Sequence, residues 1–244
     1  MKIIAHRGDC MNAPENTLAS VRLALKQRVD YVEFDIQMTK EGVPILFHDL
    51  LIEDPRYPSH FCCIQELSLH DLAAIDVGVQ FSEAFRATPI PTFEQVLSLE
   101  TGQTGYFIEI KSRGRVAAGD FHSLATLIRA HSLTRASVIG SLQPAVTAQL
   151  KEAELPLRLV GIAATEADIE AFIKQKVDVL AVRQQHLSLS AIARLHQLGL
   201  EVWGWVIDDF SHAEELAFWG LDGVITNNSA RFMSKRTEQQ KAPR

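Results

Sequence analysis

The chain has 244 residues, of which 47% are hydrophobic and 22% charged, and its formal net charge is −6. This composition is typical of a folded domain and excludes wholesale disorder. No block of Lys or Arg runs through the chain, so a nucleic-acid partner, which requires a basic face, is not expected.

Short apolar runs alternate with amphipathic helical patterns along almost the whole chain. We expect eight strands, at residues 2–6, 31–36, 105–111, 136–141, 157–162, 179–182, 201–207 and 222–226. Apolar residues at three- and four-residue spacing predict helices at residues 16–28, 93–100, 118–131, 144–154, 166–175, 189–198 and 211–219. Eight such units predict an α/β fold, a (β/α)₈ TIM barrel. An open doubly wound sheet is the alternative, but no G-x-G-x-x-G follows the first strand to support its dinucleotide-binding form.

One region interrupts this alternation after the second strand. Thr39-Lys40-Glu41-Gly42 predicts a turn and residues 44–48 a second extended run, so we expect a β-hairpin there. Residues 49–87 then predict an insertion with at most one short helix, at 64–75, and a stretch this long without regular repeats is typically functional. We therefore expect a single TIM-barrel domain over residues 1–233, followed by a polar, frayed C-terminal tail at 234–244.

The N-terminus and the cysteines indicate the compartment. Residues 1–5 form too short an apolar run for a signal peptide, and no segment approaches the length of a membrane span. Cys10, Cys62 and Cys63 match no zinc-binding spacing and suit a reducing environment. We therefore expect a cytoplasmic protein with no stable membrane insertion.

Two acidic residues share one face of the second predicted strand. Residues two apart on a strand point to the same side, so in Val32-Glu33-Phe34-Asp35-Ile36 the acids face the barrel interior and the apolar residues face the helices. Two like charges in a low-dielectric interior require a cation or a shared proton. Carboxylate oxygens suit Mg²⁺ or Ca²⁺ better than zinc, so a divalent-cation site is the simplest prediction. The competing interpretation is a solvent-exposed acidic pair on an edge strand.

The third predicted strand repeats this pattern. In Phe107-Ile108-Glu109-Ile110-Lys111, Glu109 and Lys111 share the inward face. An inward Glu109 would complete a three-carboxylate site, and Lys111 would place an ammonium group near it. A simple Glu–Lys ion pair is the alternative interpretation.

Two histidines lie where predicted strands end. His6 ends the first strand and is followed by Arg7, which can hold a phosphate by a two-pronged contact, and by Gly8, whose backbone permits a sharp exit. His48 ends the return strand of the hairpin, where the turn would place it opposite Glu33. A single histidine is more often a packing residue, but histidines, acids and cations gathered at strand ends favour a catalytic site.

In order and spacing, these residues resemble the glycerophosphodiester phosphodiesterase family. The shared motifs cover nearly the whole chain: His6-Arg7-Gly8, Pro14-Glu15-Asn16-Thr17, Glu33-Phe34-Asp35, Thr39-Lys40-Glu41-Gly42, His48-Asp49, Ile90-Pro91-Thr92, Glu109-Ile110-Lys111, the strand of Trp205, and Asp222-Gly223-Val224-Ile225-Thr226. Any one triplet would be a weak signal, whereas the ordered set is highly specific.

The resemblance implies metal-dependent hydrolysis of a small-molecule phosphodiester. Its products would be sn-glycerol 3-phosphate and an alcohol. The family pattern implies the following roles here: metal ligands Glu33, Asp35 and Glu109; acid–base residues His6 and His48; substrate-binding residues Arg7, Lys111 and Trp205. The motifs are compatible with either histidine as the base, and with attack by water or by the substrate's own glycerol hydroxyl.

The chain also departs from the family pattern. A usual Trp-Thr-Val-Asn reads Trp205-Val206-Ile207-Asp208, and an Asp-x-Pro after the last strand reads Asn227-Asn228-Ser229. These departures bear on the substrate more than on the reaction. One alternative is therefore a lysophospholipase D-like enzyme whose insertion forms an apolar slot with Phe61, Phe81 and Phe85. A non-catalytic phosphodiester-binding barrel is the other, and the intact set of acids and histidines counts against it.

Overall fold

Eight parallel strands close into a barrel in the computed structural model, which describes residues 1–55, 57, 59–112, 116–133 and 136–241. The barrel strands are β1 (Lys2–Ala5), β2 (Tyr31–Met38), β6 (Gly105–Ile110), β7 (Val138–Ser141), β8 (Arg158–Ala163), β9 (Val179–Arg183), β10 (Glu201–Trp205) and β11 (Gly223–Thr226). Neighbouring strands pair in parallel, and β1 pairs with both β11 and β2, which closes the barrel. The predicted TIM barrel is confirmed.

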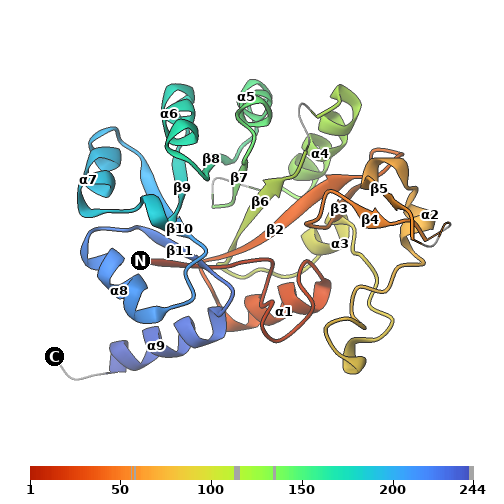
Figure 1. The fold of residues 1–244 in the computed structure, drawn as a ribbon, viewed down its shortest axis with the longest axis horizontal. Helices are drawn as coiled ribbons and strands as arrows, with labels where there is room; N and C mark the ends of the chain where they lie inside the picture. Colours follow the sequence, from red (N-terminus) through yellow and green to blue (C-terminus); the bar gives the residue numbers. More distant parts are fainter. Residues whose placement is uncertain (56, 58, 113–115, 134–135, 242–244) are drawn as a thin grey trace.

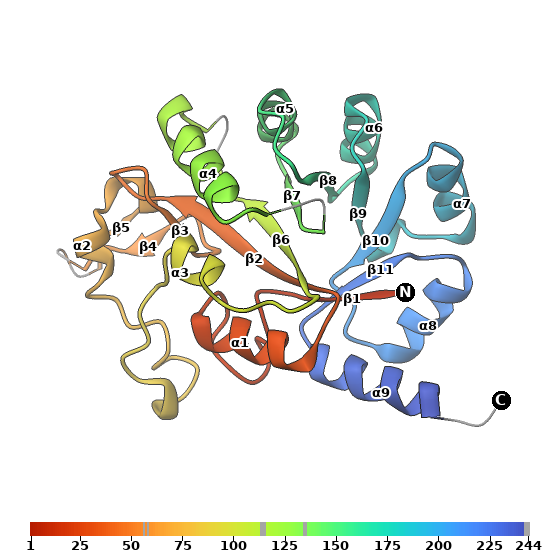
Figure 2. The ribbon, with the colours of Figure 1, turned by 180° about the vertical axis from the view of Figure 1, so that it is seen from behind.

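Helices surround the barrel on its outer side (Figures 1 and 2). They are α1 (Leu18–Gln27), α3 (Phe93–Leu97), α4 (Ala118–Ala130), α5 (Pro144–Glu152), α6 (Glu166–Gln175), α7 (Leu189–Gln197), α8 (Phe210–Phe218) and α9 (Ser229–Lys241). The Thr17 side chain caps the first turn of α1 by accepting from the Ser20 backbone N–H. Across the described residues, no helix combines the length and the hydropathy that a membrane crossing requires.

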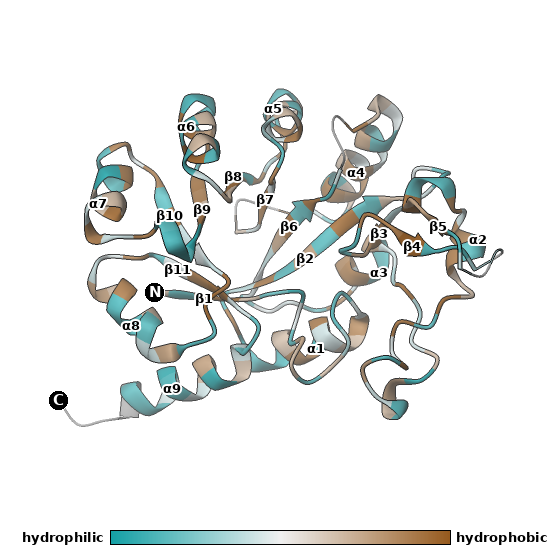
Figure 3. Ribbon diagram, viewed as in Figure 1, coloured by the Kyte–Doolittle hydropathy of each residue, from teal (hydrophilic) through white to brown (hydrophobic). Residues whose placement is uncertain are grey.

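Side chains of the barrel strands alternate between two apolar layers. Tyr31, Phe107 and Trp203 lie inside the barrel, where the ring of Trp203 is 5.0 Å from that of Tyr31 and 5.7 Å from that of Phe107. Val32, Phe34 and Ile36 belong to the outer layer, which packs against the helices. Figure 3 shows hydrophilic segments on β2 and β6, the strands that carry the predicted acidic residues. The predicted orientation of β2, with its acids inward, is therefore correct.

A β-hairpin follows β2, as predicted, but its register differs from the expectation. Strand β3 (Pro44–Leu46) runs antiparallel to β2 and pairs Leu46 with Ile36. In this register residue 48 aligns with residue 34, so the prediction that His48 lies opposite Glu33 is wrong by one residue. The physical reason is the turn, in which three residues, 40–42, separate Thr39 from its hydrogen-bonded partner Val43 (3.0 Å).

The insertion at residues 49–87 has more regular structure than predicted. It contains β4 (Ile52–Glu53), which pairs antiparallel with β5 (Phe61–Cys62), and the short helix α2 (Leu69–Leu72) flanked by 3₁₀ turns at Ile64–Glu66 and Glu83–Phe85. Its small core is shared with the hairpin and comprises Ile45, Ile52, Ile64, Leu67, Leu72 and Ile90. In Figure 1 this insertion projects to one side of the barrel, beyond the end of β2.

Helix α9 occupies most of the expected tail. Its Phe232 is fully buried and its ring lies 5.2 Å from that of Phe210, while Arg236 pairs with Asp30 at 2.5 Å. The helix lies beside α1 (Figures 1 and 2). The expectation of a frayed segment from residue 234 is therefore wrong as far as residue 241, and residues 242–244 lie outside the described part.

Candidate active site

Three carboxylates from two neighbouring strands converge inside the barrel. Strand β2 carries Glu33 and Asp35, and the parallel register of β2 and β6 places Asp35 beside Glu109. One oxygen of each carboxylate lies within 4.8 Å of the other two. All three residues are buried, with exposed fractions of 1%, 1% and 7%. We call these three residues the carboxylate cluster. The structure brings them together as the sequence predicted.

The electrostatics of the carboxylate cluster favour a bound cation. Burial raises the pKa of Glu33 well above its usual range, and the charges of Asp35 and Glu109 raise it further. Burial and Asp35 also raise the pKa of Glu109 to about 7. Among the described residues nothing donates a hydrogen bond to the buried Oε1 of Glu33. An unsatisfied buried oxygen in a crowd of carboxylates fits a hard divalent cation such as Mg²⁺ or Ca²⁺.

Two cations flank Asp35. The ammonium of Lys111 lies 3.3 Å from Asp35 Oδ1 and 2.7 Å from Glu109 Oε1, and Arg7 Nε lies 3.4 Å from Asp35 Oδ2. Burial opposes ionisation of Asp35, but Lys111 and Arg7 outweigh that effect and lower its pKa. The Glu109–Lys111 ion pair considered from the sequence therefore exists, and it forms part of the cluster rather than an alternative to it.

The loop after β1 presents the backbone of Arg7 to this cluster. Arg7 adopts a left-handed conformation with φ of +55°, which costs a non-glycine residue about 1–2 kcal/mol. Its backbone N–H donates to Glu33 Oε2 at 2.7 Å. Gly8 follows with φ of +79°, and a Cβ at this position would lie 2.6 Å from Ser20 atoms. The predicted sharp exit at Gly8 is therefore a steric requirement.

Two residues just before α1 support the site: Asn16 contacts the carboxylate cluster and Glu15 contacts Arg7. Asn16 Nδ2 donates to Asp35 Oδ2 at 2.8 Å, and the Asp35 backbone N–H donates to Asn16 Oδ1 at 3.0 Å. Glu15 accepts from Arg7 Nη1 with both oxygens, at 2.9 and 3.0 Å. The only sequence signal for these roles was the motif that places Glu15 and Asn16 just before α1.

Each candidate catalytic histidine has a polar partner at Nδ1. His6 Nδ1 lies 2.7 Å from Asn227 Oδ1, and His48 Nδ1 lies 2.8 Å from Asp49 Oδ1. Burial and the charge of Arg7 lower the pKa of His6 to about 4. Sequence reasoning missed Asn227 as a site residue, since it appeared only as a departure from the family pattern.

Trp205 ends β10 and is half-buried against the inner core. Its Nε1 donates to the Ala181 carbonyl at 3.1 Å, and the guanidinium of Arg183 lies 5.1 Å from its ring. Trp203 fills the barrel interior. Trp205 is absent from the lining of the two pockets beside His48, so its contact with substrate stays a prediction.

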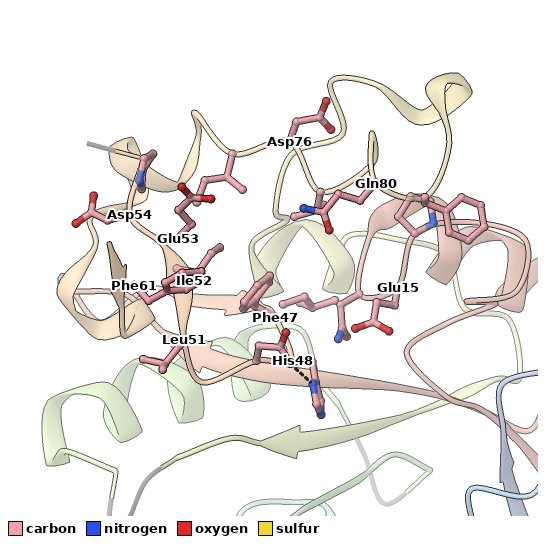
Figure 4. Close-up of a pocket in the computed structure, with 18 residues that line it drawn as sticks. Glu15, Phe47, His48, Leu51, Ile52, Glu53, Asp54, Phe61, Asp76 and Gln80 are labelled. Carbon is pink, nitrogen blue, oxygen red and sulfur yellow. Dashed lines mark hydrogen bonds and ion pairs between the residues drawn. The ribbon is translucent and has the colours of Figure 1, made fainter. Parts of the chain in front are cut away.

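These two pockets lie on either side of the segment at residues 48–51. The first, of about 720 Å³, lies between the insertion, which supplies Glu53, Phe61 and Asp76, and the segment of Glu15 (Figure 4). The second, of about 600 Å³, includes Glu109 and Lys111 and reaches Leu142 on the far side. His48 lines both pockets. Of the carboxylate cluster, Glu109 lines the second pocket, and no member of the cluster lines the first.

The slot considered for an acyl chain is only partly present. Phe61 and Phe81 line the first pocket, whereas Phe85 does not and instead packs against the ring of Phe81, with ring centroids 5.4 Å apart. The predicted contribution of Phe85 is therefore wrong. Its place in a 3₁₀ turn directs its ring to Phe81.

Comparisons with known proteins agree with this geometry. Residues 6–231 match the model of the glycerophosphoryl diester phosphodiesterase family. The chain is 25% identical to a glycerophosphodiester phosphodiesterase of Caldanaerobacter subterraneus, over 93% of each chain, and 28% identical to one of Bacillus subtilis, over 92% of this chain and 82% of the relative. Its fold resembles that of a phosphodiesterase of Oleispira antarctica solved with the product sn-glycerol 3-phosphate (TM-score 0.85, 23% identity, 97% of both chains). With most of its length matched by the family model, the chain belongs to the glycerophosphoryl diester phosphodiesterase family and is an enzyme of that class.

Proposed function

We propose that this enzyme hydrolyses glycerophosphodiesters to sn-glycerol 3-phosphate and an alcohol, with a divalent cation bound at the carboxylate cluster. The observation that carries the proposal is the convergence of three buried carboxylates with Arg7 and Lys111 at one end of the barrel. The product-bound relative from Oleispira antarctica supports a small phosphate ester as the ligand.

The charges of the carboxylate cluster and the two cations that flank Asp35 match one phosphodiester, when Glu15, which pairs with Arg7 outside the cluster, is left aside. The three carboxylates outnumber the cations Arg7 and Lys111 by one when all are ionised. A divalent cation reverses the sign of this excess, and the single negative charge of a phosphodiester then neutralises it. Such a match stabilises charge that grows on the phosphoryl oxygens during the reaction.

The side chains divide the chemistry among them. A divalent cation held by Glu33, Asp35 and Glu109 would supply Lewis-acid stabilisation of the phosphoryl oxygens. Arg7 and Lys111 donate hydrogen bonds to the same oxygens and orient the phosphate. His6 and His48 exchange protons with the attacking and leaving oxygens, a role that contributes about 10²–10⁴-fold to a rate.

The test is a metal-controlled assay of product release. We expect the chelated enzyme to release no glycerol 3-phosphate from glycerophosphocholine or glycerophosphoethanolamine, and to recover activity with Mg²⁺ or Ca²⁺. Full activity after exhaustive chelation would exclude the metal. Binding of the substrates without any turnover under all metal conditions would favour the non-catalytic barrel instead.

Lysophospholipids are a second candidate substrate, because the rim of the pockets is apolar. Leu50, Leu51 and Phe61 are exposed by 39%, 45% and 67%, and all three line the second pocket beside Lys111. An acyl chain laid on this rim would cover them. Parallel rates for lysophosphatidylcholine and glycerophosphocholine decide between the candidates, and Phe61→Ser should lower only the lysophosphatidylcholine rate if the rim binds a chain.

A further inference from the structure

The partner of His6 determines which of its ring nitrogens carries the proton. Among the described residues, the His6 ring has one hydrogen-bond partner, Oδ1 of Asn227. The fold creates this pairing because β1 and β11 are parallel with Ala5 beside Thr226, so that the next residue of each strand emerges side by side. An amide offers either a donor or an acceptor to such a neighbour. The orientation of the Asn227 amide therefore decides the tautomer of His6.

Asp208 fixes that orientation. Its carboxylate faces three donors: Asn227 Nδ2 at 2.8 Å, the Asn227 backbone N–H at 2.7 Å and Thr226 Oγ1 at 2.9 Å. An ionised carboxylate can only accept, so the amide nitrogen of Asn227 faces Asp208 and the amide oxygen faces His6. Asp208 is solvent-exposed, but Thr226 is fully buried, and its hydroxyl also accepts from the Asn228 backbone N–H at 3.1 Å.

The contact with Cys10 agrees with the same orientation. Its Sγ lies 3.4 Å from Asn227 Oδ1. Burial raises the pKa of Cys10 to about 12, so the group is a neutral thiol and can donate. Asn227 Oδ1 thus faces a thiol donor on the Cys10 side, and the same oxygen lies 2.7 Å from His6 Nδ1. The reversed amide would place its oxygen against the Asp208 carboxylate.

We propose that Asn227 and Asp208 are positioning residues that hold His6 as its Nδ1–H tautomer, with Nε2 unprotonated as the proton acceptor of the reaction. The attacking oxygen gives its proton to His6 Nε2 as it bonds to phosphorus. The bond from phosphorus to the alcohol oxygen breaks, and that oxygen takes a proton from His48. The two histidines then return to their starting states through solvent.

The surroundings of the two histidines agree with these roles. Burial and Arg7 disfavour a resting charge on His6, as a proton acceptor requires. Asp49 Oδ1 lies 2.8 Å from His48 Nδ1 and can accept a hydrogen bond from it, which orients the His48 ring. The division of roles rests on the proposed function, whereas the tautomer of His6 does not.

Side-chain ¹⁵N NMR of the metal-free protein at neutral pH tests the tautomer directly. His6→Gln identifies the His6 signals by their disappearance. We expect the proton of His6 on Nδ1, the opposite of the form that free histidine prefers. A proton on Nε2 would overturn the inference, whatever the activity of the enzyme.

Variants test whether Asp208 sets this state. In Asp208→Asn the amide of Asn227 can reverse, so we expect a mixture of His6 tautomers. The fall in kcat should be about 10- to 100-fold, smaller than most losses of a whole general base because part of the protein keeps the active tautomer. The double variant Asp208→Asn, Asn227→Asp exchanges the two side chains. The carboxylate at position 227 can then accept from His6 Nδ1, and the amide at position 208 can donate to that carboxylate. The double variant should recover the tautomer and most of kcat, with a higher apparent pKa in kcat/KM because a carboxylate now faces His6.

A matched control removes a neighbouring charge. Asp209→Asn deletes the next carboxylate and keeps the cap of α8, whose first turn donates to Asp209 at 2.9 Å, so it should leave tautomer and kcat unchanged. An unaltered tautomer and kcat in Asp208→Asn would overturn the positioning role. Nδ1–H in a protein that hydrolyses no phosphodiester would refute the proposed function and uphold the tautomer assignment.

Discussion

The two ends of the barrel both hold clusters of charge, and they differ in whether those charges are matched. At the start of the strands, Glu201 accepts from Lys2, Arg158 and the indole of Trp203 at 2.5, 2.6 and 2.6 Å. Burial opposes ionisation of Glu201, but these donors outweigh it and lower its pKa. At the opposite end Glu33 has a raised pKa and an oxygen without a donor among the described residues.

This difference separates stability from function. A carboxylate whose hydrogen bonds are complete stabilises the fold and has no capacity left for a ligand. A carboxylate cluster with excess negative charge destabilises the ligand-free fold, and this cost is recovered when a cation binds. The same contrast holds in barrels generally, where the C-terminal face carries catalysis and the opposite face stability.

Of the substitutions considered, Glu33→Gln should have the largest effect on activity, because it changes the end of the barrel that holds the carboxylate cluster. Loss of one ligand from the carboxylate cluster should lower kcat/KM by about 10³-fold, since a catalytic metal supplies several kcal/mol. The metal-free variant should melt at a higher temperature than the parent, because the substitution removes a carboxyl group whose ionisation the folded state disfavours. Metal-supplemented kinetics and thermal melts measure both. A variant that is active and less stable would contradict the assignment.

His48→Ala tests the proposal that His48 donates the proton to the leaving oxygen. We expect a loss in kcat of about 10²-fold with an alkyl leaving group, which needs a proton as it departs. The loss should shrink with a p-nitrophenol leaving group, which departs without one. Equal losses with both leaving groups would argue against a donor role. His6→Ala is the comparison, because its loss should not depend on the leaving group.

Glu201→Gln should show the reverse pattern. Removing the charge that pairs with Lys2 and Arg158 should lower the free energy of unfolding by about 2 kcal/mol, less than for a fully buried pair because these side chains are partly exposed. Activity should stay within about twofold of the parent. Denaturant unfolding and steady-state kinetics check this. A large loss of turnover in a folded protein would mean that the two ends are coupled.

The pH dependence should also differ between the ends. Because the folded pKa of Glu109 is raised to about 7, its contribution to stability is complete below its usual value near 4.5 and is lost as pH rises through 7 in metal-free protein. Metal binding should therefore weaken by at least about tenfold per pH unit below 7, because a proton on Glu109 competes with the metal and Glu33, whose pKa is also raised, adds to the effect. Titrations of Mg²⁺ or Ca²⁺ at pH 6 and 8 test this, and equal affinities would contradict it. Glu201, with its lowered pKa, should lose its contribution only on acidification.

Most of the barrel could be predicted from the sequence because strand and helix periodicity is local. Alternation along β2 and β6 was sufficient to place Glu33, Asp35 and Glu109 on the inner face. The predicted register of the hairpin is wrong by one residue. A turn of two residues and a turn of three residues are both compatible with Thr39-Lys40-Glu41-Gly42, so the sequence does not distinguish them. The tail was missed because the burial of Phe232 depends on α1 and α8, which lie far away in sequence.

The amino-acid sequence by itself determined which side chains face the barrel interior and which strand ends carry the candidate catalytic residues. Only the closed barrel decided which of them touch. The parallel register of neighbouring strands places Asp35 beside Glu109 and His6 beside Asn227. The loop between β1 and α1 places Asn16 beside Asp35. Periodicity describes one strand at a time, whereas these contacts depend on how separate strands align, and that alignment is a property of the whole packed sheet.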